Sequence, residues 1–66
     1  MQAIINGEAQ ILPDASTVAL LVDRLGLKEG KVAVEVNLAI VPRSLYGQTS
    51  LHEGDKIEIV QFIGGG

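Results

Sequence analysis

The sequence predicts an α+β domain in which one main helix packs across a mixed sheet of four to five strands. Three observations support this fold class: one segment with helical periodicity, several short alternating segments, and turn-forming residues between them. The chain has 66 residues, which is room for a single domain. We expect residues 1–63 to form that domain and residues 64–66, all glycine, to form a flexible tail.

The first element is expected to be a β-hairpin. The opening residues alternate, so that Ile5 faces one side of the sheet and Ile4 the other. The Asn6-Gly7 pair favours a tight turn with positive φ, and the segment "AQIL" then returns as a second strand.

The second element is a helix over the segment "STVALLVDRLG". Ser16 or Thr17 can supply the N-cap oxygen, and Gly26 stands where a left-handed C-terminal cap is expected. The apolar residues recur at helical spacing and form one stripe: Val18, Leu21, Val22 and Leu25. The helix therefore buries one face and should lie across the sheet.

A pair of strands follows the helix. The segment "VAVEVN" alternates, with its valines on one face. A tight turn at Asn37 leads into a short strand over residues 39–41, although Leu38 is unfavourable at the positive φ that such a turn requires. The segment "RSLYGQTSL" is irregular, with room for one short helical turn.

The last strand is "KIEIVQFI". Ile57 and Ile59 face one side of it, whereas Val60 and Phe62 face the other. A hairpin, a crossing helix, a strand pair and a late strand, in this order, are the arrangement of the β-grasp, or ubiquitin-like, fold.

Composition argues against several classes of protein. The net charge of −3 and the pI of about 4.8 disfavour binding to nucleic acid or to an anionic membrane. No run approaches the ~20 apolar residues that cross a bilayer, and no signal peptide is visible, so we expect a cytoplasmic protein. Without cysteine and with His52 as the single histidine, neither a disulfide nor a metal site is expected.

Catalytic groups are equally scarce. His52 lies beside "EGD" in an expected turn, where a solvated side chain is expected rather than the buried, oriented base of a Ser-His-acid triad. The glycine tail is not a phosphate-binding loop, because such a loop lies between a strand and a helix. We therefore expect a carrier or a binding module rather than an enzyme, with no bound cofactor.

The tail offers one distinctive group, the α-carboxylate of Gly66. Gly64 and Gly65 have no side chain, so they form a thin leader that can thread a narrow channel into a partner's active site. Adenylation by ATP would activate the carboxylate, and a sulfur donor could then replace AMP to leave a thiocarboxylate.

The sequence resembles a known family, the ThiS-type sulfur carrier proteins of thiamine biosynthesis. The resemblance covers essentially the whole chain and rests on "VAVEVN", "IVPR" and "EGDKIEIVQFIGGG". It implies adenylation of Gly66 by an E1-like (ThiF-type) adenylyltransferase that uses ATP and magnesium. Conversion to the thiocarboxylate would follow, with sulfur from a donor such as a cysteine desulfurase or its relay. The resemblance further implies delivery of that sulfur to thiazole synthase (ThiG-type).

A chain with such a tail needs a surface that docks on its partner. Val60 and Phe62 point away from the helix-covered face, with Ile4 beside them if the last strand pairs with the first. We therefore predict an apolar partner-binding patch of these three residues near the tail, since contiguous exposed apolar groups mark interfaces. Four charged residues are candidates for charge complementarity with the partner: Arg43, Glu53, Asp55 and Glu58.

Other functions stay open at this stage. The small subunit of molybdopterin synthase (MoaD-type) also ends in Gly-Gly on the same fold, although that family tends to be longer. A ubiquitin-like modifier joined to lysines and a non-covalent interaction module with an inert tail are the remaining alternatives. The intact mass after co-expression with an E1-like enzyme and a sulfur source distinguishes them.

Overall fold

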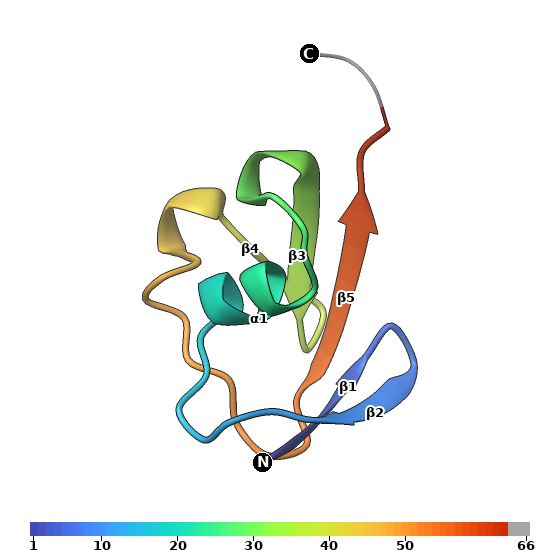
Figure 1. Cartoon of the computed structure of the whole chain (residues 1–66), viewed down its shortest axis with the longest axis vertical. Coiled ribbons are helices and arrows are strands. Elements are labelled where there is room, and N and C mark those ends of the chain that lie inside the picture. Colours follow the sequence, from blue (N-terminus) through green and yellow to red (C-terminus); the bar gives the residue numbers. More distant parts are fainter. Residues whose placement is uncertain (64–66) are drawn as a thin grey trace.

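Five strands form one mixed sheet in the computed structural model, which describes residues 1–63 (Figure 1). The strands are β1 (Gln2–Ile5), β2 (Glu8–Ile11), β3 (Val32–Val36), β4 (Ala39–Val41) and β5 (Lys56–Gln61). Their order in the sheet is β2-β1-β5-β3-β4, in which β1 and β5 run parallel and every other neighbouring pair is antiparallel. The β-grasp prediction is therefore confirmed, with the last strand in the middle. The predicted tail, residues 64–66, lies outside the described residues.

The helix α1 (Val18–Arg24) lies across one face of this sheet (Figure 1). Thr17 is its N-cap, because its Oγ1 accepts a hydrogen bond of 3.1 Å from the amide of Leu20. Gly26 follows with a φ of +75°, as predicted for a left-handed cap. Three residues of the predicted stripe are buried, but Leu25 is partly exposed because it is the C-cap, where the helix ends.

Both hairpins turn on two residues with positive φ. In the first, Asn6 and Gly7 have φ values of 50° and 83° between the paired residues Ile5 and Glu8. In the second, Asn37 and Leu38 have φ values of 51° and 73°. Two positive φ values in a two-residue loop match the twist of the flanking strands. The second hairpin forms this turn although a left-handed residue with a side chain costs roughly 1–2 kcal/mol.

Hydrogen bonds to the start of β5 hold the second turn in place. The side chain of Asn37 accepts from the amide of Lys56 at 3.0 Å and donates to Oδ1 of Asp55 at 3.0 Å. The backbone amide of Asn37 also donates to the carbonyl of Lys56, at 2.7 Å. These bonds offset the strain at Leu38, whose side chain is 89% exposed and gains nothing from burial.

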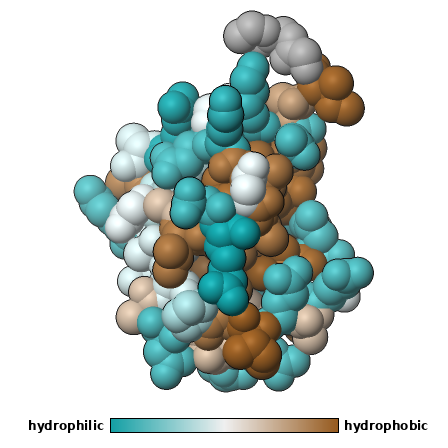
Figure 2. Space-filling view, in the orientation of Figure 1, coloured by the Kyte–Doolittle hydropathy of each residue, from teal (hydrophilic) through white to brown (hydrophobic). Residues whose placement is uncertain are grey.

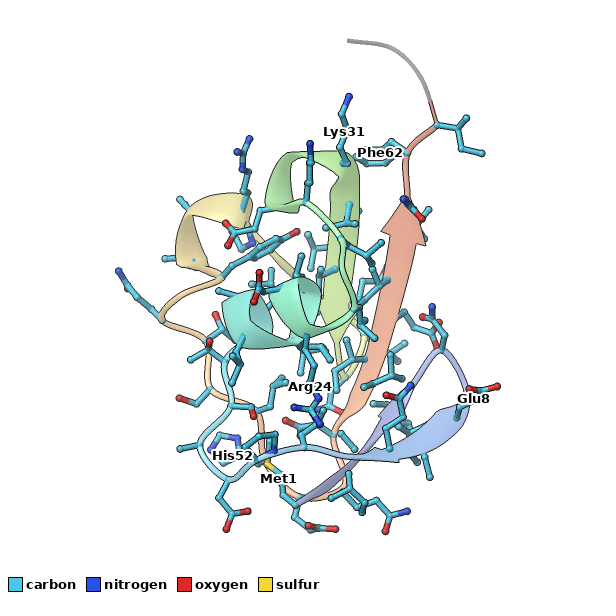
Figure 3. The ribbon with its side chains drawn as sticks, in the orientation of Figure 1. Met1, Glu8, Arg24, Lys31, His52 and Phe62 are labelled. Carbon is cyan, nitrogen blue, oxygen red and sulfur yellow. The ribbon has the colours of Figure 1, made fainter. Side chains whose placement is uncertain are left out.

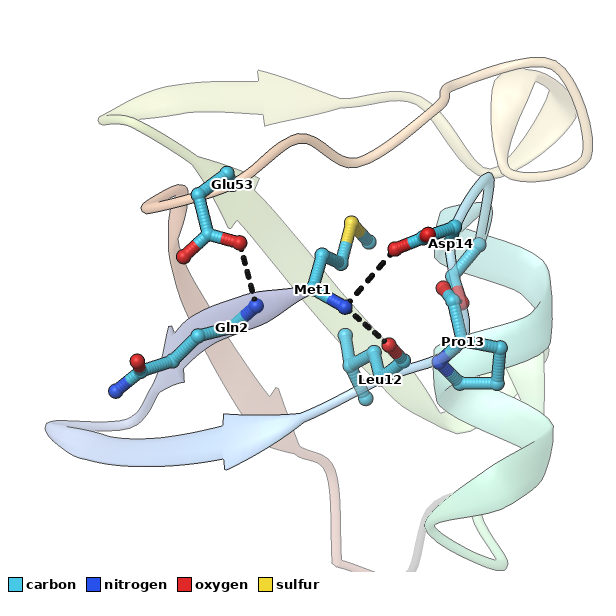
Figure 4. Close-up of polar contacts among 7 residues, drawn as sticks. Met1, Gln2, Leu12, Pro13, Asp14 and Glu53 are labelled. Carbon is cyan, nitrogen blue, oxygen red and sulfur yellow. Dashed lines mark hydrogen bonds and ion pairs between the residues drawn. The ribbon is translucent and has the colours of Figure 1, made fainter.

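Polar contacts also fasten the start of the chain to two neighbouring segments (Figure 4). The ammonium group of Met1 donates to the carbonyl of Leu12 at 2.8 Å and pairs with Asp14 at 3.0 Å. The amide of Gln2 donates to the carboxylate of Glu53 at 2.9 Å. β1 is thereby fixed against both the end of the first hairpin and the turn that precedes β5.

The core lies between the sheet and α1, and it draws on every strand except β2. Two short 3-10 turns, η1 (Glu29–Lys31) and η2 (Arg43–Leu45), close one end of it. The buried apolar residues are Ala3, Ile5, Leu12, Val18, Leu21, Val22, Val32, Val34, Val41, Tyr46, Leu51, Ile57 and Ile59. Within the described residues, no helix has the length and hydrophobicity to span a bilayer. No element of residues 1–63 covers the opposite face of the sheet (Figure 1).

The side chain of Asn6 extends the sheet beyond the end of β1. Its backbone amide donates to the carbonyl of Ile57 at 2.9 Å. Its side chain then accepts from the amide of Ile59 at 2.7 Å and donates to the carbonyl of Ile59 at 3.2 Å. One carboxamide thus satisfies both backbone groups of Ile59 on the side where β1 has already turned away.

Two carboxylates oppose each other at the centre of the uncovered face. Glu35 on β3 and Glu58 on β5 are direct cross-strand partners. Neither of them makes an ion pair with any residue between 1 and 63. Like charges placed directly opposite each other destabilise a sheet.

We predict that Asn6→Gly destabilises the chain by about 1–2 kcal/mol, because it removes both side-chain bonds to Ile59. Glycine keeps the positive φ of the turn, so the change isolates the side chain. Hydrogen exchange of the Ile59 amide should accelerate more than that of Val34. Equal acceleration at the two amides would show that Asn6 does not hold β5 locally.

We predict that Glu58→Gln raises the free energy of unfolding by about 0.2–1 kcal/mol at low salt, because it removes the repulsion from Glu35. The gain should shrink at high salt, which screens exposed charges. Urea unfolding measures the effect. Glu8→Gln is the matched control, since Glu8 lies opposite the apolar Ile5; the idea fails if the two variants gain equally.

Candidate functional site

The candidate site is the end of β5, where the described chain leaves the sheet (Figure 1). β5 is the central strand, with β1 on one side and β3 on the other. Ile57 is fully buried and Ile59 nearly so, and both pack into the core beneath α1. The strand that leads to the glycines is therefore anchored by its side chains and by backbone bonds to two neighbours.

Backbone pairing continues almost to the last described residue. Gln61 pairs with Val32, and the amide of Phe62 donates to the carbonyl of Lys31 at 2.8 Å. Ile63 follows with 99% of its surface exposed. Backbone hydrogen bonding to the sheet is thus observed up to Phe62, and Ile63 separates that residue from the three glycines. Those glycines, among them the predicted reactive residue Gly66 and its leader Gly64 and Gly65, lie outside the described residues.

Val60 lies where the alternation of β5 predicts, and Phe62 follows one residue beyond the end of that strand. They are 60% and 53% exposed. Val60 alternates with the buried Ile59 and so lies on the face that α1 does not cover, whereas Phe62 lies next to Lys31 (Figure 3). Val60 is paired with Ala33 on β3, so the apolar surface extends from β5 onto its neighbour. These two residues are close to the exit of the chain and provide an accessible apolar surface there.

Ile4 does not join them. The last strand does pair with the first, but the parallel register places Ile4 beside Lys56, at the beginning of β5. Val60 lies four residues further along, a distance of about 13 Å at the rise of a β-strand. Ile4 is also half-buried. The structure therefore keeps Ile4 on the same face but separates it from the other two residues, with the Glu35–Glu58 pair in between.

The four charged candidates fall into different places. Glu53 and Asp55 serve the fold, because they accept hydrogen bonds from the amides of Gln2 and His52 respectively. Glu58 lies on the uncovered face. Arg43 lies on η2, and its guanidinium group packs against Gly30 of η1.

Tyr46 is the C-cap of η2 and is buried, with its hydroxyl 3.4 Å from the carbonyl of Val32. Burial raises the pKa of the Tyr46 phenol, the carboxylate of Glu29 raises it further, and the charge of Arg43 opposes both. The phenol therefore stays neutral at neutral pH, and Tyr46 is part of the buried core.

His52 has the solvated position that the sequence predicts. Its side chain is 79% exposed, and its Nδ1 lies 3.9 Å from the carboxylate of Asp55. Figure 3 shows it at the opposite end of the molecule from Phe62. His52 is thus remote from the exit of β5.

Sequence reasoning missed two features of this site. Asn6 was expected only as a turn residue, yet its carboxamide completes the pairing of Ile59. The signal available was an amide side chain, which both donates and accepts, at the end of a strand beside the predicted last strand. The contact between Arg43 and η1 could not be predicted from a local sequence pattern, because it joins separate segments of the chain.

Comparison with known proteins gives a consistent result. The model of the ThiS family matches residues 2–66. The sulfur carrier protein ThiS of Escherichia coli is 33% identical over 66 residues, which cover the whole of both chains. The crystal structure of the thiamine biosynthesis protein ThiS from Geobacter metallireducens superposes with a TM-score of 0.84 at 28% identity, again over the whole of both chains.

Two longer relatives are named thiazole synthase. The protein of Paramagnetospirillum magneticum is 52% identical and that of Magnetococcus marinus is 46% identical, each over 66 residues. The match covers all of this chain but only 20% of each synthase. A family match over nearly all residues, a full-length relative and a shared fold lead to one conclusion: the chain belongs to the ThiS family.

Proposed function

We propose that this chain is a sulfur carrier for thiamine biosynthesis and that Gly66 carries the sulfur as a thiocarboxylate. One observation carries the proposal: β5 is fixed in the middle of the sheet and leads, through the exposed Ile63, directly into three glycines. The name of the full-length relative from Escherichia coli, sulfur carrier protein, supports it. In this proposal the chain is a protein substrate and not an enzyme.

The proposed chemistry begins at the carboxylate of Gly66. A carboxylate is a poor electrophile, so an E1-like adenylyltransferase of the ThiF type would bind ATP and magnesium and catalyse its activation. A carboxylate oxygen attacks the α-phosphorus of ATP, pyrophosphate leaves, and an acyl adenylate forms. The terminal sulfur of a persulfide on the donor, such as a cysteine desulfurase or its relay, then attacks the acyl carbon and AMP leaves with the bonding electrons. A thiol reduces the resulting acyl disulfide, which releases the thiocarboxylate and leaves the donor sulfur in a disulfide with that thiol.

The anchoring of β5 suits such a reaction. A reaction between two bound groups is fast when both are held in position. The sheet fixes the chain up to Phe62, so a partner that grips the domain also fixes the point from which the glycines start. Glycine has no Cβ, so the remaining residues can enter a channel that would exclude any side chain.

Thiazole synthase is the proposed acceptor of the sulfur. Two relatives with that name contain a segment similar to this whole chain, which puts a carrier-like part and a synthase in one protein. The thiocarboxylate would donate its sulfur to thiazole formation and return to the carboxylate. We place these reactions in the cytoplasm, where ATP is available to the activating enzyme.

Val60 and Phe62 form the proposed contact with these partners. Both are exposed next to the exit of the chain, so a partner that receives the glycines must also approach them. Ile4, which the alternation pattern groups with them, lies on the far side of the same face, since Lys56 is its neighbour on β5.

We predict that the intact chain gains the mass difference between sulfur and oxygen when incubated with the ThiF-type enzyme, ATP, magnesium and a sulfur donor. Gly65→Val should block the gain, because a branched side chain cannot enter the channel. Gly47→Val is the matched control, since a Cβ on Gly47 meets no atom within 4 Å and its φ is ordinary. Mass spectrometry of the intact chain measures all three proteins.

Each alternative outcome has a distinct meaning. No gain by the wild type contradicts the carrier proposal and favours an interaction module with an inert tail. Linkage to lysines of other proteins favours a ubiquitin-like modifier. Sulfur transfer to a molybdopterin precursor, and not to thiazole, favours the MoaD-type function. A gain by Gly65→Val equal to that of the wild type contradicts the narrow channel.

We predict that Phe62→Ala weakens binding to the activating enzyme about tenfold, because exposed aromatic residues contribute strongly to interfaces. The fold should stay intact, since Phe62 lies outside the core. Calorimetric titration measures the affinity. Ile11→Ala is the matched control, because Ile11 is an exposed apolar residue on the edge strand β2; equal losses in the two variants would count against a specific contact at Phe62.

A further inference from the structure

Three of the five cationic residues of the chain lie on or next to the 3-10 turns beside the exit of β5. The carbonyl of Lys31 accepts a hydrogen bond of 2.8 Å from the amide of Phe62. The amide of Lys31 in turn donates to the carbonyl of Lys28 at 2.9 Å. The Arg43 guanidinium comes within 3.0 Å of the position that a Cβ on Gly30 would occupy. We call Lys28, Lys31 and Arg43 the cationic collar.

The side-chain view places Lys31 of the collar beside Phe62 (Figure 3). Figure 3 shows Lys31 next to Phe62 at one end of the long axis, whereas Met1 and His52 lie at the other end. In Figure 2 hydrophilic side chains gather at the same end, close to where the last described residues leave. The collar thus lies on the η1 side of the base of the segment that carries the proposed reactive group (Figure 1).

The collar reverses the charge of the molecule locally. Its three cations and the carboxylate of Glu29 give a charge of +2, while the whole chain carries −3. The rest of the chain therefore carries −5. The molecule is electrically polar, with its positive end at the exit of β5.

Glu29 does not neutralise the collar. Glu29 is half-buried, and its carboxylate raises the pKa of the buried Tyr46 phenol. Lys28 and Arg43, by contrast, are exposed. Among residues 1–63, no ion pair involves any of the three cations. The collar presents unpaired positive charge to the surroundings.

Chain geometry decides what this charge can contact. The three glycines after Ile63 span at most about 11 Å when extended. When the carboxylate of Gly66 is inside the partner's active site, the collar must stay outside, at the mouth of the channel. Lys31 and Arg43 are then in position to contact the rim of that mouth and not the nucleotide.

We propose that the cationic collar binds a ring of aspartate and glutamate residues at the mouth of the tail channel of the activating enzyme. The inference rests on the proposed function and names the chemistry of its partner surface. An acidic rim attracts the positive end and repels the negative remainder, so the chain arrives with its glycines first. Charge complementarity of this kind acts mainly on the rate of encounter and on orientation.

The test measures pyrophosphate released from ATP by the ThiF-type enzyme as the concentration of the full chain is varied. The double variant Lys28→Glu/Lys31→Glu should raise the KM for the chain about tenfold and leave kcat unchanged, since exposed ion pairs are individually weak. Arg24→Glu is the matched control, because Arg24 lies on α1 away from the collar (Figure 3). Raising the salt from roughly 50 to 300 mM should increase the KM of the wild type but not that of the double variant.

Several results would overturn the proposal. These are an unchanged KM in the double variant, an equal rise in Arg24→Glu, or a fall in kcat at constant KM. The third result would place the collar at the chemistry and not at the mouth. Absence of pyrophosphate release with the wild type defeats the proposed function itself, and the collar proposal with it. Thermal unfolding of each variant confirms that the compared proteins are folded.

Discussion

The pairing of β5 between β1 and β3 is the interaction on which the rest of the structure depends. The first hairpin and the second hairpin do not touch each other in the sheet, and β5 alone joins them. Its pairing with β1 is short, with Ile4 and Ile5 as the only strand residues in register, and the carboxamide of Asn6 lengthens it to Ile59. Because the last strand joins the two halves, the segment that leaves the molecule starts from its most constrained strand.

The uncovered face of the sheet carries features that do not stabilise this small domain. A chain of this size buries only about 60% of its unfolded surface. Among residues 1–63 the helix α1 covers one face of the sheet, and no helix covers the other (Figure 1). The other face carries exposed apolar residues such as Val60 and Ile40, and it also holds two carboxylates in direct opposition. Neither feature stabilises the isolated chain. Both are understandable on a surface that a partner covers for part of the proposed cycle.

Local patterns in the sequence predicted the elements well, and they failed where distant segments meet. Alternation in "VAVEVN" and "KIEIVQFI" gave the correct faces, and the turn at Asn37 formed despite Leu38, because β5 supplies hydrogen bonds that no local rule contains. The separation of Ile4 from Val60 depends on the register between residues more than 50 positions apart. Periodicity predicts the face of the sheet on which a side chain lies, but it does not predict which residue of the neighbouring strand lies beside it. The packing of Arg43 against Gly30 is likewise a product of the whole fold.

A carrier must leave each partner as readily as it binds, and the two surfaces near the exit suit that requirement. Exposed ion pairs add little to affinity, but complementary charge speeds the encounter. The proposed apolar contact at Phe62 would add affinity over a small area, and differences in affinity act mainly on the rate of release. A collar that orients and a small apolar patch that holds give fast and reversible docking. In the proposed cycle the thiocarboxylate on Gly66 carries the sulfur from one partner to the next, and the domain need only deliver and withdraw its last residues.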